Sequence, residues 1–340
     1  MRKAICVILS ALFILPACSC GAGMKRYTRI ITGYFDTATS VTAYDISDEA
    51  FEEHISEFEV LLKDYDELYS IYDDVEGINN LKTINDNAGI APVTVDQKII
   101  YLLLYGRECY ELSDGKVNIC FGSVLRIWHQ YREEDANTLP GEDELSEALL
   151  HTSIDDLVID EAASTVYLQD PLMSLDVGAI AKGYAGKMIC EYASEHLWHD
   201  AAVSFGGNVI TFGNKNADGH TPWNILIENP DLDSADEFLT VKTTDNCVIT
   251  SGDYQRFYIV DGKRYCHIID PETLFPASNF TSVTVICDDS ALGDLLSTLL
   301  FIEDQEEGLS LIESLDGVEA IWTDQEYNVT YSSGALNYAG

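Results

Sequence analysis

Basic residues are scarce in this chain. Only 19 lysines and arginines stand against 58 aspartates and glutamates among 340 residues, which gives a formal net charge of −39. Such an acidic surface repels DNA, RNA and anionic lipid, so it excludes nucleic-acid binding through a basic face. Any phosphate ligand has to be met locally, by backbone amides, by one or two cations or by a bound metal ion. The abundant carboxylates favour a hard divalent cation in that position.

Paired cysteines are also missing, because no two show the Cys-x-x-Cys spacing of a zinc site or a redox dithiol. We expect the cysteines to act mainly as small apolar residues. The nine are Cys6, Cys18, Cys20, Cys109, Cys120, Cys190, Cys247, Cys266 and Cys287. The chain lacks a short repeat, a linker rich in proline and serine, and any apolar segment after the N-terminus that is long enough to span a membrane. Residues 29–340 are therefore expected to form one compact domain.

The N-terminus has the layout of a secretory signal. Arg2 and Lys3 precede an apolar run from Ala4 to Leu15, as in a signal peptide. The run is shorter than the roughly twenty residues that a bilayer-spanning helix needs, although a transmembrane anchor is the alternative. Its end, Leu15-Pro16-Ala17-Cys18, resembles a bacterial lipobox, which is cleaved before a cysteine that then carries lipid.

This N-terminal pattern predicts the location of the protein. We expect a lipoprotein signal peptide over residues 1–17, a lipid on Cys18 and a tether over residues 18–28. The protein would then be exported and lipid-anchored at the cell membrane, facing outside the cytoplasm.

Helical periodicity is clearest between residues 47 and 72, where apolar side chains recur on one face and acidic residues occupy the other. Further helices are predicted over residues 95–112, 180–197 and 291–302. Strands are predicted at 201–205, 209–212, 224–227, 254–260, 265–269 and 282–286, with Asp261-Gly262 as a hairpin turn. These elements show no regular βαβ alternation. We therefore predict an α+β fold of mostly antiparallel sheets with packed helices.

Two glycine-rich stretches are candidate ligand sites. In DVGAIAKGYA, residues 176–185, Lys182 stands between Gly178 and Gly183, where a strand is expected to meet a helix. Helix N-termini offer unpaired N–H groups to phosphate. Taken alone, however, the stretch fits a plain strand-to-helix turn with a solvated lysine better. In the second stretch, Gly206-Gly207 lies between two predicted strands, and either a β-turn or close approach to a ligand would explain it.

Polar side chains form two further candidate sites. His267 lies near the end of a hairpin strand, close to a loop that carries Ser251 and Asp253; it is either a packed strand histidine or a functional one. Asp294 and Thr298 are four residues apart on a predicted helix, so both can point at one ion. In that case Asp294 is expected to be an exposed carboxylate of the pocket. The alternative is an ordinary pair on the helix surface.

Taken together and in this order, these stretches resemble the ApbE-like family, the FAD:protein FMN transferases. The motifs that carry the resemblance are DVGAIAKGYA, FGGN, TSGDYQRF, KRYCHIIDP and DLLST, preceded by FDTATSVTAYD, YSIYDDVEGINNLK and SDGKVNICFG. They extend over nearly all of the mature chain. The resemblance implies a duplicated α+β fold related to the T-fold proteins, FAD as the donor substrate, and a magnesium ion.

The resemblance also implies roles for individual residues. The main-chain carbonyl of Ala179 and the side chains of Asp294 and Thr298 would hold Mg²⁺, and His267 would be the base. The residues implied to contact FAD are Phe35, Tyr72, Lys116, Val117, Asn118, Asp176, Lys182, Gly206, Gly207 and Ile268. The chain departs from the family pattern at Leu274, where glycine is usual, and at Asn118, where aspartate is common.

Three functions are compatible with these observations. The first is transfer of FMN from FAD to a threonine or serine of an acceptor, which would be an extracytoplasmic domain of a membrane redox protein. The second is hydrolysis of FAD to FMN and AMP in the same site. The third is a flavin-binding lipoprotein without catalysis. A fragment similar to acceptor sequences, Ser333-Gly334-Ala335-Leu336, is interpreted as a chance match because its outer residues differ.

Overall fold

The computed structural model describes residues 23–134, 136–231, 234 and 238–339, and an eight-stranded sheet is the centre of the fold. The strand order is β1-β2-β6-β7-β10-β13-β14-β15, and all neighbours run antiparallel. The strands are β1 (Lys25–Tyr34), β2 (Thr37–Asp45), β6 (Ala201–Phe205), β7 (Asn208–Phe212), β10 (Cys247–Gly252), β13 (Phe280–Cys287), β14 (Glu319–Asp324) and β15 (Val329–Tyr331). This arrangement confirms the predicted α+β fold of mostly antiparallel sheets.

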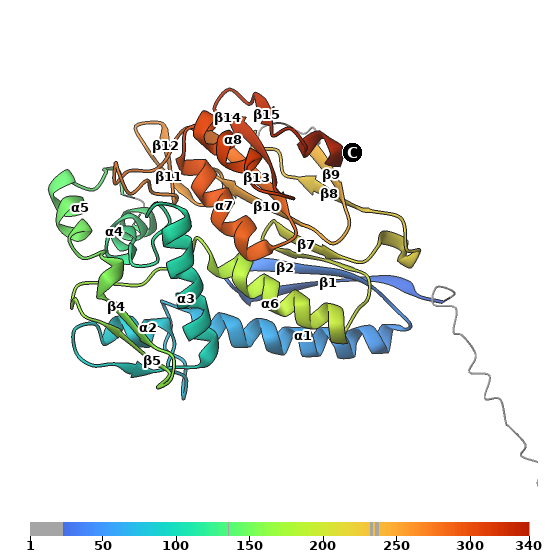
Figure 1. Ribbon diagram of the computed structural model, residues 1–340, viewed down its shortest axis with the longest axis horizontal. Coiled ribbons are helices and arrows are strands. Elements are labelled where there is room, and N and C mark those ends of the chain that lie inside the picture. The colour runs from blue at the N-terminus through green and yellow to red at the C-terminus, as the bar shows by residue number, and fades with distance from the viewer. Residues whose placement is uncertain (1–22, 135, 232–233, 235–237, 340) are drawn as a thin grey trace, which may run out of the picture.

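One face of this sheet is covered by helices (Figure 1). They are α1 (Asp48–Tyr69), α6 (Ala181–His196), α7 (Ser290–Ile302) and α8 (Gln305–Glu313). Helix α1 buries a stripe at helical spacing that includes Phe51, Ile55, Phe58 and Leu62, because these apolar side chains recur every three to four residues along its length. The stripe belongs to the main hydrophobic core, between the helices and the sheet.

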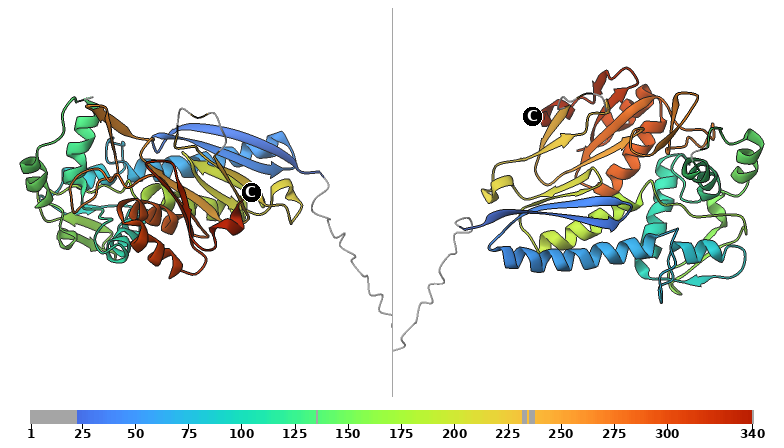
Figure 2. Two further views of the ribbon diagram at one scale, coloured as in Figure 1. Left: turned by 90° about the horizontal axis from the view of Figure 1, so that it is seen from above. Right: turned by 180° about the vertical axis from the view of Figure 1, so that it is seen from behind.

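The other face of the sheet is covered by a hairpin of β8 (Trp223–Ile227) and β9 (Leu239–Thr243) and by a short 3-10 helix, Ala335–Tyr338. Figure 2 shows this hairpin on the side turned away from the helices. Strand β13 therefore has cover on both sides, and all of its residues are buried. This explains why its sequence, FTSVTVIC, does not alternate strictly between apolar and charged residues.

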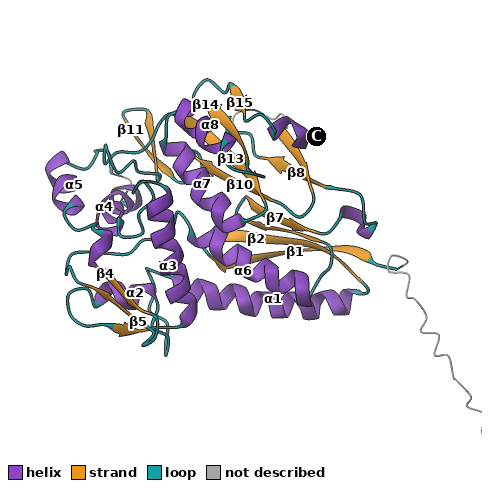
Figure 3. Cartoon of the chain, in the orientation of Figure 1, coloured by secondary structure: helices purple, strands orange, loops and turns teal. Residues whose placement is uncertain are grey.

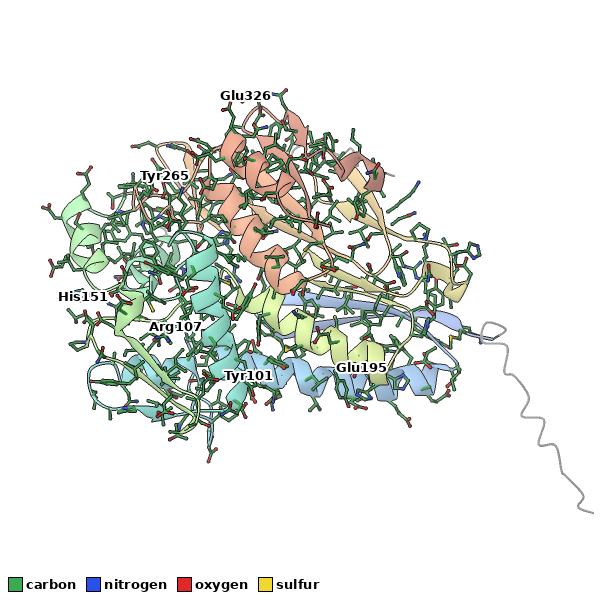
Figure 4. All side chains as sticks on the ribbon, viewed as in Figure 1. Tyr101, Arg107, His151, Glu195, Tyr265 and Glu326 are labelled. Atoms are coloured by element: carbon green, nitrogen blue, oxygen red, sulfur yellow. The ribbon has the colours of Figure 1, made fainter. Side chains whose placement is uncertain are left out.

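A second region packs at one end of the main sheet (Figure 3). It consists of α2 (Leu81–Asp86), α3 (Gln97–Leu112) and a small sheet of β3 (Val93–Thr94), β4 (Leu157–Asp160) and β5 (Thr165–Leu168). Further short 3-10 helices are Ile154–Asp156 and Lys215–Ala217. Arg107 donates a hydrogen bond from α3 to the Leu157 carbonyl at the start of β4, and Figure 4 shows its side chain beside α3 on the side of the small sheet.

A third group of elements has a hydrophobic core of its own. Helices α4 (Gly122–Glu133) and α5 (Glu142–Leu149) pack with the hairpin of β11 (Phe257–Val260) and β12 (Lys263–Cys266). We call it the α4–hairpin core, and its buried residues are Phe121, Val124, Trp128, Leu145, Tyr258, Val260, Ile269 and Leu274. Helices α4 and α5 were not among the predicted elements.

The hairpin turn at Asp261-Gly262 is confirmed, since Val260 pairs with Lys263 across it. The predicted limits of the two strands, 254–260 and 265–269, were wrong at the start of the first strand and at both ends of the second. Residues 254–256 form a turn and a bend that precede β11. After β12, the Ile268 carbonyl accepts a hydrogen bond from Ala277 N, and Asp270 N donates to the Phe275 carbonyl. These residues therefore bond to the next turn of the chain and leave the hairpin.

Two other boundaries also differ from prediction. Strand β1 begins at Lys25 and pairs with β2 from there, so the folded domain starts before residue 29 and residues 25–28 are not tether. Helix α1 ends at Tyr69 rather than at residue 72, because the Ser70 hydroxyl accepts hydrogen bonds from the N–H groups of Tyr72 and Asp73. The predicted signal peptide and Cys18 lie outside the described residues.

The cysteine prediction is confirmed for the described residues. All six of them there, Cys109, Cys120, Cys190, Cys247, Cys266 and Cys287, are buried free thiols. Burial raises their pKa values, that of Cys120 to about 12, so these thiols stay protonated and pack as apolar groups. Within the part of the chain that the structure describes, no helix is long and apolar enough to cross a membrane.

Candidate active site

A cavity of about 580 Å³ lies where the main sheet, the α4–hairpin core and the start of α6 meet. The sequence-predicted residues come from segments far apart in the chain, yet nearly all of them line it. They are Phe35, Tyr72, Lys116, Val117, Asn118, Asp176, Ala179, Lys182, Gly206, His267, Ile268, Asp294 and Thr298. Gly207 does not line the cavity; its N–H donates to the Ser204 hydroxyl at 3.2 Å, within the turn between β6 and β7.

A close crossing of two helices brings Asp294 into the site. A Cβ atom on Gly183 would lie 2.3 Å from the Ser290 carbonyl oxygen and 2.4 Å from the Asp294 Cβ, so only glycine permits α6 and α7 to approach so closely. Helix α6 has no side-chain cap of its own. The Gly183 N–H instead donates to Asp294 Oδ2 at 2.8 Å, and a carboxylate at a helix N-terminus is electrostatically favourable.

Asp294 is a buried carboxylate, which corrects the expectation of an exposed one. It is 4% exposed. Besides the bond from Gly183, its Oδ1 accepts a hydrogen bond from Asn208 Nδ2 at 2.9 Å, and Lys182 Nζ lies 3.7 Å from the same oxygen. Burial of a carboxylate is tolerated when both oxygens have donors and a cation is near. The pair with Thr298 is therefore not an ordinary pair on the helix surface.

The oxygen atoms around Asp294 fit a hard divalent cation. In a longer helix the Gly183 N–H would bond to the Ala179 carbonyl, but here Asp294 accepts it. Ala179 and the Thr298 side chain line the cavity together with Asp294, which gives one anionic and two neutral oxygens. Magnesium prefers such ligands and keeps several waters. No group of three His, Cys, Asp or Glu side chains that could hold a metal occurs among the described residues, and Asp294 is the carboxylate of this donor set.

His267 is half-buried and lines the same cavity. Its Nδ1 lies 3.3 Å from the Arg256 carbonyl oxygen. Because a carbonyl only accepts hydrogen bonds, Nδ1 carries the proton and Nε2 keeps its lone pair. Burial, with the positive charges of Arg256, Lys182 and Arg132, lowers the pKa of His267 to about 3. The imidazole is therefore a neutral base at pH 7.

Helix α4 provides a wall of the cavity that sequence reasoning missed. Phe121, Leu125 and His129 are spaced four residues apart and all line the cavity. His129 Nδ1 lies 3.3 Å from the hydroxyl of Tyr72, and burial lowers the pKa of His129. The four-residue spacing of Phe121, Leu125 and His129 was the one sequence signal of this helix face. Gly122 and Ser123, which are weak helix formers, made a helix here hard to predict.

The turn between β1 and β2 forms another wall. Phe35 and Asp36 join the two strands, and their φ angles are 52° and 50°. A left-handed backbone conformation costs a residue other than glycine about 1–2 kcal/mol. The turn is fixed by Asp66 of α1, whose Oδ1 accepts a hydrogen bond from Phe35 N at 2.7 Å. Phe35, Asp36 and Asp66 all line the cavity.

The departure at Asn118 has a structural reason. Its side-chain amide donates to the Thr152 carbonyl at 2.9 Å, and its Oδ1 accepts from Cys120 N at 2.8 Å. Aspartate could accept the second bond but could not donate the first. The asparagine therefore connects the segment before α4 to the segment after α5, and both ends of its side chain are engaged.

The departure at Leu274 combines backbone strain with burial. Leu274 has a φ of 64°, in the region that favours glycine. Its side chain is buried in the α4–hairpin core, and its carbonyl accepts a hydrogen bond from Trp128 Nε1 at 2.9 Å. The side chain adds apolar contacts that a glycine would lack, while its backbone is strained in a way that a glycine would relieve.

We therefore expect the usual order of alanine and glycine to be reversed at this position. Leu274→Ala should lower the free energy of unfolding by about 2–5 kcal/mol, because it removes a buried side chain. Leu274→Gly should lower it by about 1 kcal/mol less, since glycine relieves the left-handed strain. Urea unfolding of both variants measures the difference. A glycine variant less stable than the alanine variant would contradict this account.

Several known proteins are similar to this chain. The sequence model of the ApbE family matches residues 35–322. The chain is 30% identical to the FAD:protein FMN transferase of Klebsiella pneumoniae, over 78% of this chain and 83% of that protein. It is 33% identical to the enzyme of the same name from Treponema pallidum, over 76% of this chain and 74% of that protein.

A solved structure supports the same relationship. The crystal structure of the ApbE protein from Thermotoga maritima aligns with a TM-score of 0.81 and 26% identity. The alignment covers 93% of this chain and all of that one. The family match covers most of the chain, and therefore this chain belongs to the ApbE family.

Proposed function

We propose that this protein transfers the FMN portion of FAD to a threonine or serine hydroxyl of an acceptor protein and releases AMP. The observation that carries the proposal is the convergence of His267, Lys182 and the oxygens around Asp294 in one cavity of about 580 Å³. That volume lies within the range of small-molecule and cofactor sites. Relatives that are named FAD:protein FMN transferases support it.

Magnesium is the metal that the donor set around Asp294 favours. Asp294, Thr298 and the Ala179 carbonyl would hold it, and Lys182 adds a positive charge 3.7 Å from Asp294 Oδ1. A bound Mg²⁺ would polarise the phosphoryl group and neutralise the charge that develops on it. This explains how so acidic a chain can bind a pyrophosphate. The cations stand in the pocket itself, and they outweigh the net negative charge of the chain there.

His267 supplies the base in this proposal. Its Nδ1–H donates to the Arg256 carbonyl, so Nε2 is free to take the proton of the acceptor hydroxyl. The hydroxyl oxygen then forms a bond to the phosphorus of the FMN portion, and the bond from that phosphorus to the bridging oxygen breaks. AMP leaves with that oxygen. The lowered pKa of His267 keeps Nε2 unprotonated in the free protein, before FAD binds.

Two alternatives give different products. Water in place of the acceptor hydroxyl would yield free FMN and AMP, and a carrier without catalysis would leave FAD intact. The test is to incubate the mature protein with FAD and Mg²⁺, with and without a protein that carries a candidate acceptor segment. Covalent FMN on the acceptor supports transfer. AMP release that is the same without acceptor supports hydrolysis, and bound but unchanged FAD supports the carrier.

We further propose that the protein is exported and held at the membrane by a lipid on Cys18, and that its acceptor is an extracytoplasmic domain of a membrane redox protein. The lipobox-like sequence before Cys18 supports the anchor. Strand β1 begins at Lys25, so only a short segment separates Cys18 from the domain. An enzyme anchored in this way would stay close to acceptors in the same membrane.

Replacement of the lipobox cysteine tests the anchor. Cys18→Ala should leave the precursor uncleaved and without lipid, because the thiol is the lipid attachment point. Incorporation of labelled fatty acid and electrophoretic mobility measure this. Cys20→Ala is the matched control and should be processed normally. Normal lipid labelling of the Cys18→Ala protein would refute the assignment.

A further inference from the structure

The β1–β2 turn has an unusual sequence for its shape. Tyr34 pairs with Thr37, which leaves Phe35 and Asp36 as a two-residue connection, and both have positive φ angles. Positive φ at both positions is the pattern of a type I′ hairpin turn, which strongly prefers Asn-Gly, Asp-Gly or Gly-Gly. Neither residue here is glycine. Strained residues of this kind persist only where the surroundings over-determine them, and they concentrate at functional sites.

The surroundings of this turn are specific. Asp66, in the last turn of α1, accepts the Phe35 N–H at 2.7 Å, a charge-assisted hydrogen bond. On the side of the sheet, a Cβ atom on Gly206 would lie 2.1 Å from Thr37 Oγ1, so β2 already packs against the β6–β7 turn without spare room. The turn is thus held from the helix side by one carboxylate and limited on the sheet side by close packing.

The environment of the Asp66 carboxylate is unfavourable apart from its hydrogen bond to the turn. It is half-buried, and burial, with the nearby charges of Asp36 and Asp73, raises its pKa, while the bond from Phe35 N lowers it. A half-buried carboxylate with like charges close by is unfavourable for stability. Its one hydrogen bond among the described residues is the one to the turn. A carboxylate in so unfavourable an environment, whose hydrogen bond holds the turn, indicates that the conformation of the turn is functional.

We propose that Asp66 is a positioning residue for flavin binding, which holds the strained Phe35–Asp36 turn in its binding conformation before FAD arrives. The inference rests on the proposed function and on the contact between Phe35 and FAD that the family resemblance implies. A turn already held in place does not need to be ordered when the ligand binds, and such preorganisation increases affinity. Asp66 would therefore act on FAD affinity and on the KM for FAD, with little effect on kcat.

Replacement of Asp66 tests this in the mature protein. Asp66→Ala should weaken FAD binding by about tenfold, because the hydrogen bond to a charged acceptor is lost. Asp66→Asn keeps an oxygen acceptor for Phe35 N and should stay within about threefold of the wild type. Flavin fluorescence titration gives the dissociation constants, and kinetics at varied FAD gives KM and kcat separately. A fall in kcat at unchanged KM would overturn the proposal.

A second substitution distinguishes positioning from direct contact. Asp36→Gly introduces the residue that this turn prefers at its second position, so the turn no longer depends on Asp66. Asp36→Gly in the Asp66→Ala background should therefore recover most of the lost affinity. The single Asp36→Gly variant must also be measured, because Asp36 lies 3.9 Å from Arg256. If the double variant binds no better than Asp66→Ala, Asp66 contacts the ligand itself and the positioning role is wrong.

The control removes a neighbouring carboxylate of the same helix. Glu67 is half-buried, forms an ion pair with Lys63 and does not line the cavity, so Glu67→Ala should bind FAD as the wild type does. If Asp66→Ala does not fold, recovery of folding by Asp36→Gly supports the proposal and failure to recover it overturns it. A wild-type protein that binds no FAD would instead refute the proposed function, whereas equal binding by wild type and Asp66→Ala refutes this inference alone.

Discussion

His267→Ala is expected to slow FMN transfer by about 10²–10⁴-fold while FAD still binds, which is the usual cost of removing a general base. The geometry supports this because the Arg256 carbonyl fixes the proton on Nδ1 and leaves Nε2 free. The side chain is one of many that line the cavity, so its loss should change FAD affinity little. Single-turnover transfer to an acceptor and FAD titration of the same protein measure the two effects separately.

The matched control is a histidine remote from the cavity. His220 is exposed, and among the described residues its side chain bonds only to Asp218 of its own loop, so His220→Ala should transfer FMN at the wild-type rate. Near-normal transfer by a folded His267→Ala protein would remove His267 from the mechanism. His129 would then be the next candidate, because it is the other imidazole in the cavity.

The pH dependence follows from the environment of the same histidine. An ordinary histidine gains its proton near pH 6.5, which would give an acid limb there. Burial and the neighbouring cations lower the pKa of His267 to about 3, so the base should stay unprotonated on going down from about pH 8 to pH 5. The kcat/KM for FAD, which reports the groups of the free protein, should therefore show no His267-dependent limb in that range. A limb near pH 6.5 that disappears in His267→Ala would contradict the lowered pKa.

The sequence was most informative where one face of an element is buried. Helix α1 was predicted because its apolar stripe is regular, and the limits of α6 and α7 lie within one residue of prediction. Strand β1 was missed because it forms an edge of the sheet and is largely exposed. Helix α4 was missed because it packs against the β11–β12 hairpin, a contact that no local pattern encodes.

The residues of the cavity could be found from motifs, but their environments could not. Asp294 was predicted as a candidate ligand from its spacing to Thr298, yet its burial depends on the crossing of α6 and α7 at Gly183. Asp66 was not predicted at all, because a carboxylate on an acidic helix gives no local signal. Its contact with Phe35 joins residues 31 positions apart, which only the tertiary structure reveals.

The largest expected effect on metal dependence is at Asp294. Asp294→Asn should require at least about tenfold more Mg²⁺ for FAD cleavage and transfer, because the one anionic ligand of the site becomes neutral. It should also lower the free energy of unfolding by about 1–3 kcal/mol. The reason is that Gly183 N and Asn208 Nδ2 both donate to the carboxylate. The NH₂ group of the new asparagine would face one of these two donors, and that hydrogen bond would be lost.

Two hydroxyls of the same helix separate these two effects. Thr298 lines the cavity, so Thr298→Ala should increase the Mg²⁺ requirement with little change in stability. Ser297 is buried instead, where its hydroxyl bonds to Ser251 at 2.9 Å and to the Asp294 carbonyl at 3.1 Å. Ser297→Ala should therefore cost stability and leave the Mg²⁺ dependence unchanged. Transfer rate against Mg²⁺ concentration, with thermal unfolding of each variant, gives both quantities. If Asp294→Asn has the Mg²⁺ curve of the wild type, the carboxylate serves only to cap α6, and the metal site must be sought elsewhere in the cavity.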